Sequence, residues 1–159
     1  MTLEALNTLD KQALKEALRH CCGSTAWVNK MLASFPVADK EQLLGIASTI
    51  WQACSEADWL EAFSHHPKIG ASTTNATAAA EQAGTSTATR ETRQALAEGN
   101  RSYEERFGYI YIVCATGKTA TEMLQLLQDR LNNTPEKEIA VAMGEQQKIT
   151  HIRLEKLLL

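Results

Sequence analysis

Only one stretch of the sequence has the composition of a β-strand. Residues 109–114 (YIYIVC) are aromatic and β-branched, whereas apolar residues recur at helical spacing through most of the chain. A single strand without a partner cannot form a sheet. The sequence therefore predicts an all-α fold, and a length of 159 residues fits one compact helical domain over residues 1–159.

Several of the expected helices have recognisable start signals. Ser24 and Asp39 each precede an apolar-periodic segment and are good N-cap residues, and Pro135 is well placed as the first residue of a long helix. Small and apolar residues repeat every three or four positions over 88–107, which predicts another long helix. Residues 71–90 are rich in Ser, Thr, Ala and Gly, so we expect a loop with one helical turn there.

Charge and hydropathy argue against two classes of partner. The formal net charge is -3 and the sequence pI is about 5.8, which gives no basic surface for nucleic acid or anionic membranes. No segment approaches the roughly 18 apolar residues of a membrane span, and the N-terminus lacks a signal-peptide pattern. We expect a cytoplasmic protein without nucleic-acid or membrane partners.

The four cysteines, Cys21, Cys22, Cys54 and Cys114, include no C-x-x-C pair. This spacing signals neither a zinc site nor a dithiol redox motif. We expect reduced, mostly buried thiols and no metal site. A nucleophilic pair of Cys54 or Cys114 with His66 stays open as an alternative, because the sequence does not give the distance between these side chains.

Residues 115–119 (ATGKT) follow the strand-like stretch and precede a predicted helix, which is the order of a phosphate-binding loop. Such a loop needs a glycine at the position of Ile112. We therefore favour a helix start capped by Thr116 or Thr119, with Lys118 exposed. A P-loop-like nucleotide-binding protein is the alternative among enzymes, and a non-catalytic helical interaction module is the alternative from a different class of protein.

Residues 63–72 (FSHHPKIGAS) place two histidines at the predicted end of a helix. Because Pro67 follows His66, the backbone of His66 is biased towards an extended conformation that ends the helix. A histidine there is either a helix C-terminal cation or a functional group, and the pattern alone leaves both open. Glu81, among alanines, and Arg153, at the edge of an apolar helix face, could join it in a small site for an anionic polar substrate.

Six segments spread over nearly the whole chain carry a family resemblance: LRHCCGSTAWVNKM, FSHHPKIG, EQAG, YEERFGYIYIVCATGKTATEML, RLNNTPEKEIAVA and KITHIRLEKL. The patterns HP-x-[IL]-G and EQAG are weak singly. In this order, with Y-E-x-[KR]-F-G-[YF] and the terminal R-L helix, the combination is specific. The chain resembles the 2-oxo-4-hydroxy-4-carboxy-5-ureidoimidazoline (OHCU) decarboxylases of urate degradation.

The resemblance implies an all-helical, usually homodimeric enzyme that forms (S)-allantoin and carbon dioxide from a small-molecule substrate, OHCU, without a cofactor. It assigns the proton donor to His66, the catalytic glutamate to Glu81 and the substrate-binding arginine to Arg153. Further substrate contacts fall on Pro67, Ala78, Gln82, Tyr109, Ile110, Tyr111, Ile112 and Val113.

Two departures from the family pattern bear on these assignments. The chain between HPKIG and EQAG is shorter than in many relatives, so Glu81 is assigned by its EQAG context. A serine is common three residues before that glutamate, where this chain has Ala78, so we expect a main-chain contact there.

Overall fold

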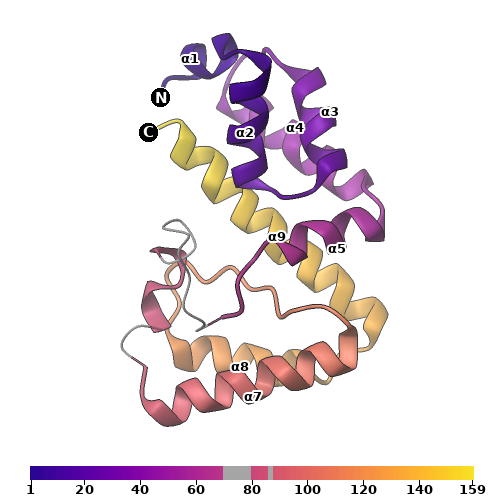
Figure 1. Cartoon of the computed structure of the whole chain (residues 1–159), viewed down its shortest axis with the longest axis vertical. Helices are drawn as coiled ribbons and strands as arrows, with labels where there is room; N and C mark the ends of the chain where they lie inside the picture. The colour runs from indigo at the N-terminus through magenta and orange to yellow at the C-terminus, as the bar shows by residue number, and fades with distance from the viewer. Residues whose placement is uncertain (70–79, 86–87) are drawn as a thin grey trace. The chain divides into compact units, whose positions relative to one another are not determined.

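The computed structural model describes residues 1–69, 80–85 and 88–159, and all regular secondary structure among them is helical (Figure 1). The predicted all-α fold is therefore confirmed for the described part of the chain. The chain divides into two compact units. Unit 1 comprises Met1–Ala62 and Gln146–Leu159, and unit 2 comprises Phe63–Glu145.

Unit 1 is built from short helices around a core that includes the fully buried Trp27 and Trp51. The predicted caps are confirmed, since Ser24 accepts a hydrogen bond from the amide of Trp27 and Asp39 accepts one from the amide of Gln42. The helices are α1 (Leu3–Thr8), α2 (Lys11–Cys21), α3 (Thr25–Ser34), α4 (Lys40–Ala53), most of α5 (Glu56–Ser64) and the end of α9 (Pro135–Leu157).

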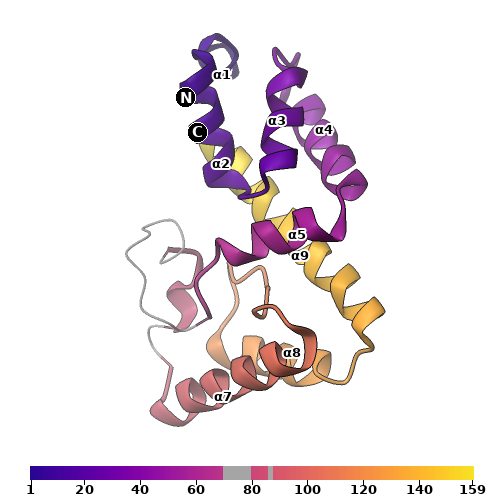
Figure 2. The ribbon, with the colours of Figure 1, turned by 45° about the vertical axis from the view of Figure 1, so that its right-hand side comes forward.

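The two ends of the chain meet in unit 1. The amino group of Met1 donates hydrogen bonds to Leu157 O at 2.8 Å and to Leu159 O at 2.9 Å. The labels N and C are neighbours in both ribbon views (Figures 1 and 2). The first and last residues therefore lie side by side.

Unit 2 centres on two packed helices, α7 (Arg90–Phe107) and α8 (Ala120–Arg130) (Figure 2). It also contains the 3-10 turn η1 (Ala83–Thr85), which precedes α7, and the start of α9, which follows α8. Its buried residues include Leu96, Tyr103, Tyr111, Met123 and Leu127. Gly99 allows α7 and α8 to approach closely, because a Cβ there would lie 2.5 Å from Leu127 Cδ2.

The strand-like stretch 109–114 connects α7 to α8 and forms no β-ladder with any described residue. It begins after Gly108, whose φ of 84° ends α7 in a left-handed C-cap. Residues 111–115 are buried. This buried, apolar segment of unit 2 therefore has no neighbouring strand among the described residues, as the sequence predicts.

The predicted loop over 71–90 lies partly outside the described residues. Where it is described, it forms η1 and the residues leading to Thr89, the N-cap of α7. None of the helices in the described ranges is long and apolar enough to cross a membrane.

Candidate functional site

His66 lies in a turn directly after α5. Its amide donates to Phe63 O at 3.2 Å, and the residue is half-buried, whereas His65 is exposed. Two residues further on, Lys68 forms an ion pair with Glu104 of α7, with 2.8 Å between Nζ and Oε2. The ion pair therefore holds the turn against α7. Within the turn, His65 is more exposed to solvent than His66.

Phe63 links this turn to the strand-like stretch. Its side chain is fully buried, and its ring centroid lies 5.4 Å from that of Tyr109. The Tyr109 ring also packs edge-on against Tyr103, with 5.8 Å between the centroids. Aromatic contacts of this kind fix ring positions and exclude water. The turn that carries His66 is thus anchored beside residue 109.

Glu81 and Gln82 lead into η1, which packs against the loop before α8. Gln82 O accepts hydrogen bonds from the amide of Thr85 at 2.9 Å and from its hydroxyl at 2.8 Å. At Gly84 there is no room for a side chain, because a Cβ would overlap Lys118 O and lie 3.2 Å from Lys118 C. The glycine of EQAG therefore lets the Glu81 turn rest on the main chain of residue 118.

Three charged side chains surround Cys114, at the end of the strand-like stretch. Lys118 Nζ donates to Cys114 O at 2.8 Å, and Cys114 N–H donates to Glu145 Oε1 at 3.2 Å. Burial raises the pKa of the Cys114 thiol, Lys118 lowers it, and Glu145 and Glu81 raise it further. Glu81 is therefore within electrostatic range of Cys114. The expectation of an exposed Lys118 is wrong, because this half-buried side chain has a main-chain acceptor to satisfy.

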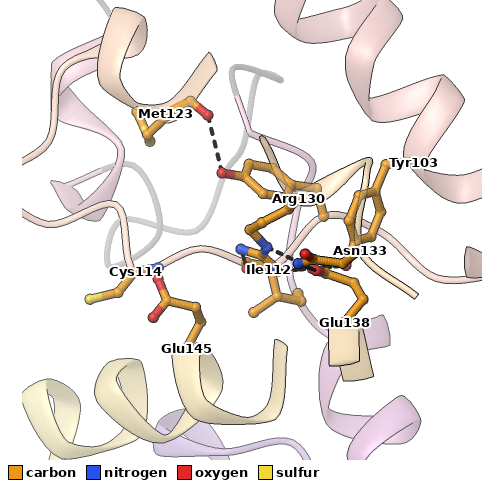
Figure 3. Close-up of polar contacts among 9 residues, drawn as sticks. Tyr103, Ile112, Cys114, Met123, Arg130, Asn133, Glu138 and Glu145 are labelled. Atoms are coloured by element: carbon orange, nitrogen blue, oxygen red, sulfur yellow. Dashed lines mark hydrogen bonds and ion pairs between the residues drawn. The ribbon is translucent and has the colours of Figure 1, made fainter. Parts of the chain in front are cut away.

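A buried network holds the middle of the same stretch (Figure 3). Arg130, at the end of α8, donates from Nη1 to Ile112 O at 2.6 Å and from Nε to Glu138 Oε1 at 2.6 Å. Its guanidinium also lies 4.7 Å from the centroid of the Tyr111 ring. Burial lowers the pKa of Arg130, but the hydrogen bond and charge of Glu138 outweigh this and raise it overall. Arg130 therefore keeps its positive charge within the core of unit 2.

Arg153 belongs to unit 1, whereas His66 and Glu81 belong to unit 2. Arg153 lies on α9, is half-buried, and donates from Nη1 to His20 O at 3.2 Å. Unit 2 brings together the His66 turn, the Glu81 turn and residues 109–114. Ala78 lies outside the described residues.

A family model described as OHCU decarboxylase matches residues 7–155. The chain belongs to the OHCU decarboxylase family. The uric acid degradation bifunctional protein TTL of Arabidopsis thaliana is 35% identical over 145 residues, which cover 86% of this chain and 45% of that relative. The chain thus spans less than half the length of this relative. A 2-oxo-4-hydroxy-4-carboxy-5-ureidoimidazoline decarboxylase of Halalkalicoccus jeotgali is 27% identical over 164 residues, 99% of this chain and 92% of the relative.

Two solved structures share the fold of this OHCU decarboxylase family member. A crystal structure of OHCU decarboxylase in the presence of (S)-allantoin has a TM-score of 0.80 and 37% identity, and the match covers 91% of this chain and 97% of that one. A crystal structure of (S)-allantoin synthase has a TM-score of 0.75 at 21% identity, covering 98% of this chain and 54% of that one.

In this member of the OHCU decarboxylase family, the GKT sequence is the start of a helix. Thr119 Oγ1 accepts from the amide of Glu122 at 3.1 Å, and Glu122 Oε1 accepts from the amide of Thr119 at 3.2 Å. This is a complete capping box, which confirms Thr119 as the cap. The neighbouring Gly117 has a φ of 76° and makes the turn, so nothing in this geometry favours a nucleotide site.

The cysteines are free and buried, as predicted. Burial raises the pKa of Cys54 and Cys114, which is the opposite of what a thiolate nucleophile requires. Among the residues that the structure describes, no group of three or more His, Cys, Asp or Glu side chains is placed to hold a metal ion. The raised pKa values of these thiols weigh against a nucleophilic pair of Cys54 or Cys114 with His66.

Sequence reasoning missed Arg130, Glu138 and Glu145, to which it gave no role. The available signal was the segment RLNNTPEKE, where an arginine and a glutamate eight residues apart flank a helix start. Such charges are usually solvated, so the pattern did not indicate that Arg130 and Glu138 are 7% and 0% exposed.

Proposed function

We propose that this chain catalyses the cofactor-independent decarboxylation of OHCU to (S)-allantoin and carbon dioxide, a step of urate degradation. The observation that carries the proposal is the likeness to OHCU decarboxylase crystallised in the presence of (S)-allantoin, at 37% identity and a TM-score of 0.80. The half-buried His66 turn beside residues 109–114 adds support from this chain itself.

The substrate makes the reaction possible without a metal or thiamine. It carries a carboxylate and a hydroxyl on one ring carbon, next to a C=N bond. When the bond to the carboxylate breaks, its electron pair moves towards that C=N bond, so the ring is its own electron sink. The enzyme has to orient the carboxylate, stabilise the developing charge and deliver one proton to one face of the ring.

We assign the proton transfer to His66, because imidazole is the side chain whose ordinary pKa lies nearest neutral pH. Glu81 orients the ring and the imidazole. Arg153 binds the anionic or carbonyl-bearing part of the substrate through its planar guanidinium. The remaining substrate contacts come from Pro67, Ala78, Gln82 and the main chain of Tyr109, Ile110, Tyr111, Ile112 and Val113, where amide donors and acceptors match a urea-like edge.

We further propose that the protein acts as a cytoplasmic homodimer. The free, buried cysteines support a reducing compartment, and the family resemblance supports the dimer. Sedimentation of the purified chain measures its mass, and a species of one-chain mass at micromolar concentration contradicts the dimer.

The test generates the unstable substrate in place from urate, with a urate oxidase and a hydroxyisourate hydrolase, and follows the circular dichroism of allantoin. We expect the wild-type protein to accelerate the appearance of the (S)-allantoin signal. His66→Ala should lose about 10²–10⁴-fold in rate while remaining folded, because this is the usual contribution of a general acid.

His65→Ala is the matched control, since the neighbouring histidine is exposed. We expect it to keep nearly full activity. A fully active His66→Ala variant, or equal losses in the two variants, contradicts the assignment of the proton donor. A wild-type protein that follows the slow, racemic spontaneous course contradicts the proposed reaction.

A further inference from the structure

The strand-like stretch has no neighbouring strand among the described residues, so no β-ladder supplies hydrogen bonds to its main chain. Among the described residues, the main chain from 110 to 113 has a single hydrogen-bond partner, the Arg130 guanidinium at Ile112 O. Buried main-chain groups normally have partners, so a segment held at one carbonyl depends strongly on that contact.

We propose that the buried pair of Arg130 and Glu138 is a positioning device that fixes the main chain of residues 110–113 for substrate binding. This inference rests on the proposed function, in which that main chain binds the urea-like edges of the substrate. Arg130 and Glu138 are positioning residues, and they act through the peptide groups that they orient.

The guanidinium of Arg130 divides its donors between two acceptors. Nη1 points to Ile112 O, while Nε and Nη2 each lie 2.6 Å from Glu138 Oε1 (Figure 3). The group also lies over the rings of Tyr111 at 4.7 Å and Tyr103 at 5.8 Å. Its planar fork makes all of these contacts from one rigid group, which a lysine ammonium on a flexible stem cannot reproduce.

Glu138 is itself held from three sides, which fixes Arg130 in turn. Oε1 accepts from Tyr103 Oη at 2.7 Å as well as from Arg130, and Oε2 accepts from Asn133 Nδ2 at 2.9 Å. The carboxylate is fully buried and lies in the first turns of α9, where a helix N-terminus favours negative charge. A buried charge with so many partners has one low-energy geometry, so the position of Ile112 O is sharply defined.

A second set of side-chain contacts holds the main chain two residues further along, at Cys114. Cys114 is held at N–H by Glu145 and at its carbonyl by Lys118, so residues 112 and 114 are both fixed by side chains. Between them, neither main-chain group of Val113 makes a hydrogen bond to any described residue. The contacts at residues 112 and 114 therefore fix the chain on both sides of Val113 and leave its N–H and C=O groups for a ligand.

The decisive experiment compares Arg130→Lys and Glu138→Gln with the wild type in the coupled (S)-allantoin assay. Both variants keep a hydrogen-bonding side chain inside unit 2. Arg130→Lys also keeps the positive charge, whereas Glu138→Gln removes the negative charge that Arg130 pairs with. We expect Arg130→Lys to raise KM about tenfold and to lower kcat/KM by about 10²-fold, because a shift of the binding edge by about 1 Å has effects of this size. Glu138→Gln should change KM in the same direction by a smaller factor.

Leu127→Ala is the control for lost stability. Leu127 is fully buried in unit 2, and its truncation creates a cavity while removing none of the side-chain hydrogen bonds among Arg130, Glu138 and Ile112 O. A purely structural change lowers the amount of active protein and leaves KM unchanged, so we expect a wild-type KM for this variant. A KM within twofold of the wild type in both Arg130→Lys and Glu138→Gln, or an equal rise in Leu127→Ala, overturns the inference. If Arg130→Lys does not fold, the KM of Glu138→Gln decides. An inactive wild-type protein refutes the proposed function instead, which keeps the two failures apart.

Discussion

Replacing Gly84 with alanine tests whether the EQAG turn is positioned by the main chain beside it. The added Cβ would overlap Lys118 O and lie 3.2 Å from Lys118 C, and both atoms belong to the main chain. Main-chain atoms cannot relieve the clash by adopting another side-chain rotamer, so η1 would have to move away from the main chain of residue 118. Restoring ordinary contact with the oxygen requires a movement of about 1 Å.

This movement has two calculable effects. Overpacking of this kind costs about 1–3 kcal/mol of unfolding free energy. Because Glu81 is three residues from Gly84 in the same turn, a displacement of about 1 Å at a catalytic group should also lower kcat/KM by about 10²-fold. Urea denaturation measures the first effect, and the coupled (S)-allantoin assay measures the second on the folded protein.

Gly45→Ala is the matched control, because a Cβ at Gly45 meets nothing within 4 Å. Gly45 lies inside α4, where alanine is the better helix former by about 1 kcal/mol. We expect this variant to be as active as the wild type and at least as stable. A Gly84→Ala protein with wild-type stability and activity would refute the reasoning, since it would mean that η1 does not rest on residue 118.

Three further outcomes follow from the structure. Thr119→Ala removes the capping box of α8 and should cost about 1 kcal/mol in urea denaturation, whereas the exposed Thr116→Ala should cost little; equal losses would argue against the cap. Burial and the hydrogen bond to Glu138 raise the pKa of Tyr103 in the folded protein. The protonated Tyr103 therefore contributes its full stability below the ordinary tyrosine pKa of about 10, and this contribution is lost as the pH rises above about 10. The unfolding free energy should fall from about pH 9 to 11 in the wild type, and less steeply in Tyr103→Phe. Burial raises the pKa of the Cys22 thiol to about 12, so we expect iodoacetamide at pH 8 to leave Cys22 unmodified in the native protein and to modify it in urea, as mass spectrometry of peptides would detect.

The helices could be predicted because their signals are local. Ser24, Asp39 and Thr119 cap the helices that follow them, and the long helix predicted over 88–107 is found at Arg90–Phe107. The packed face of that helix follows the predicted repeat: Tyr103 is buried, Ala88 and Phe107 pack against the core of unit 2, and Gly99 faces Leu127 of α8. Leu96 and Asn100, next to this repeat, are buried as well, and the spacing of small residues did not single them out.

The polar core of unit 2 could not be predicted from local pattern. The carbonyl of Ile112 is satisfied by Arg130, 18 positions later, and Arg130 is paired by Glu138 on another helix. Composition near 109–114 indicated only that no strand partner exists. Which side chains replace that partner depends on how α8 and α9 pack against α7, and this is a tertiary property that no spacing encodes.

The meeting of the chain ends in unit 1 has a practical consequence for fusion proteins. The Met1 amino group lies within 2.9 Å of carbonyl oxygens of both Leu157 and Leu159. A fusion partner joined to either terminus is therefore attached at the same place on the surface of unit 1. N-terminal and C-terminal tethering should then give similar geometries with linkers of equal length. The same proximity allows the ends to be joined by a few residues and the chain reopened at the exposed Asn132, and such a circular permutant would test whether folding depends on chain order.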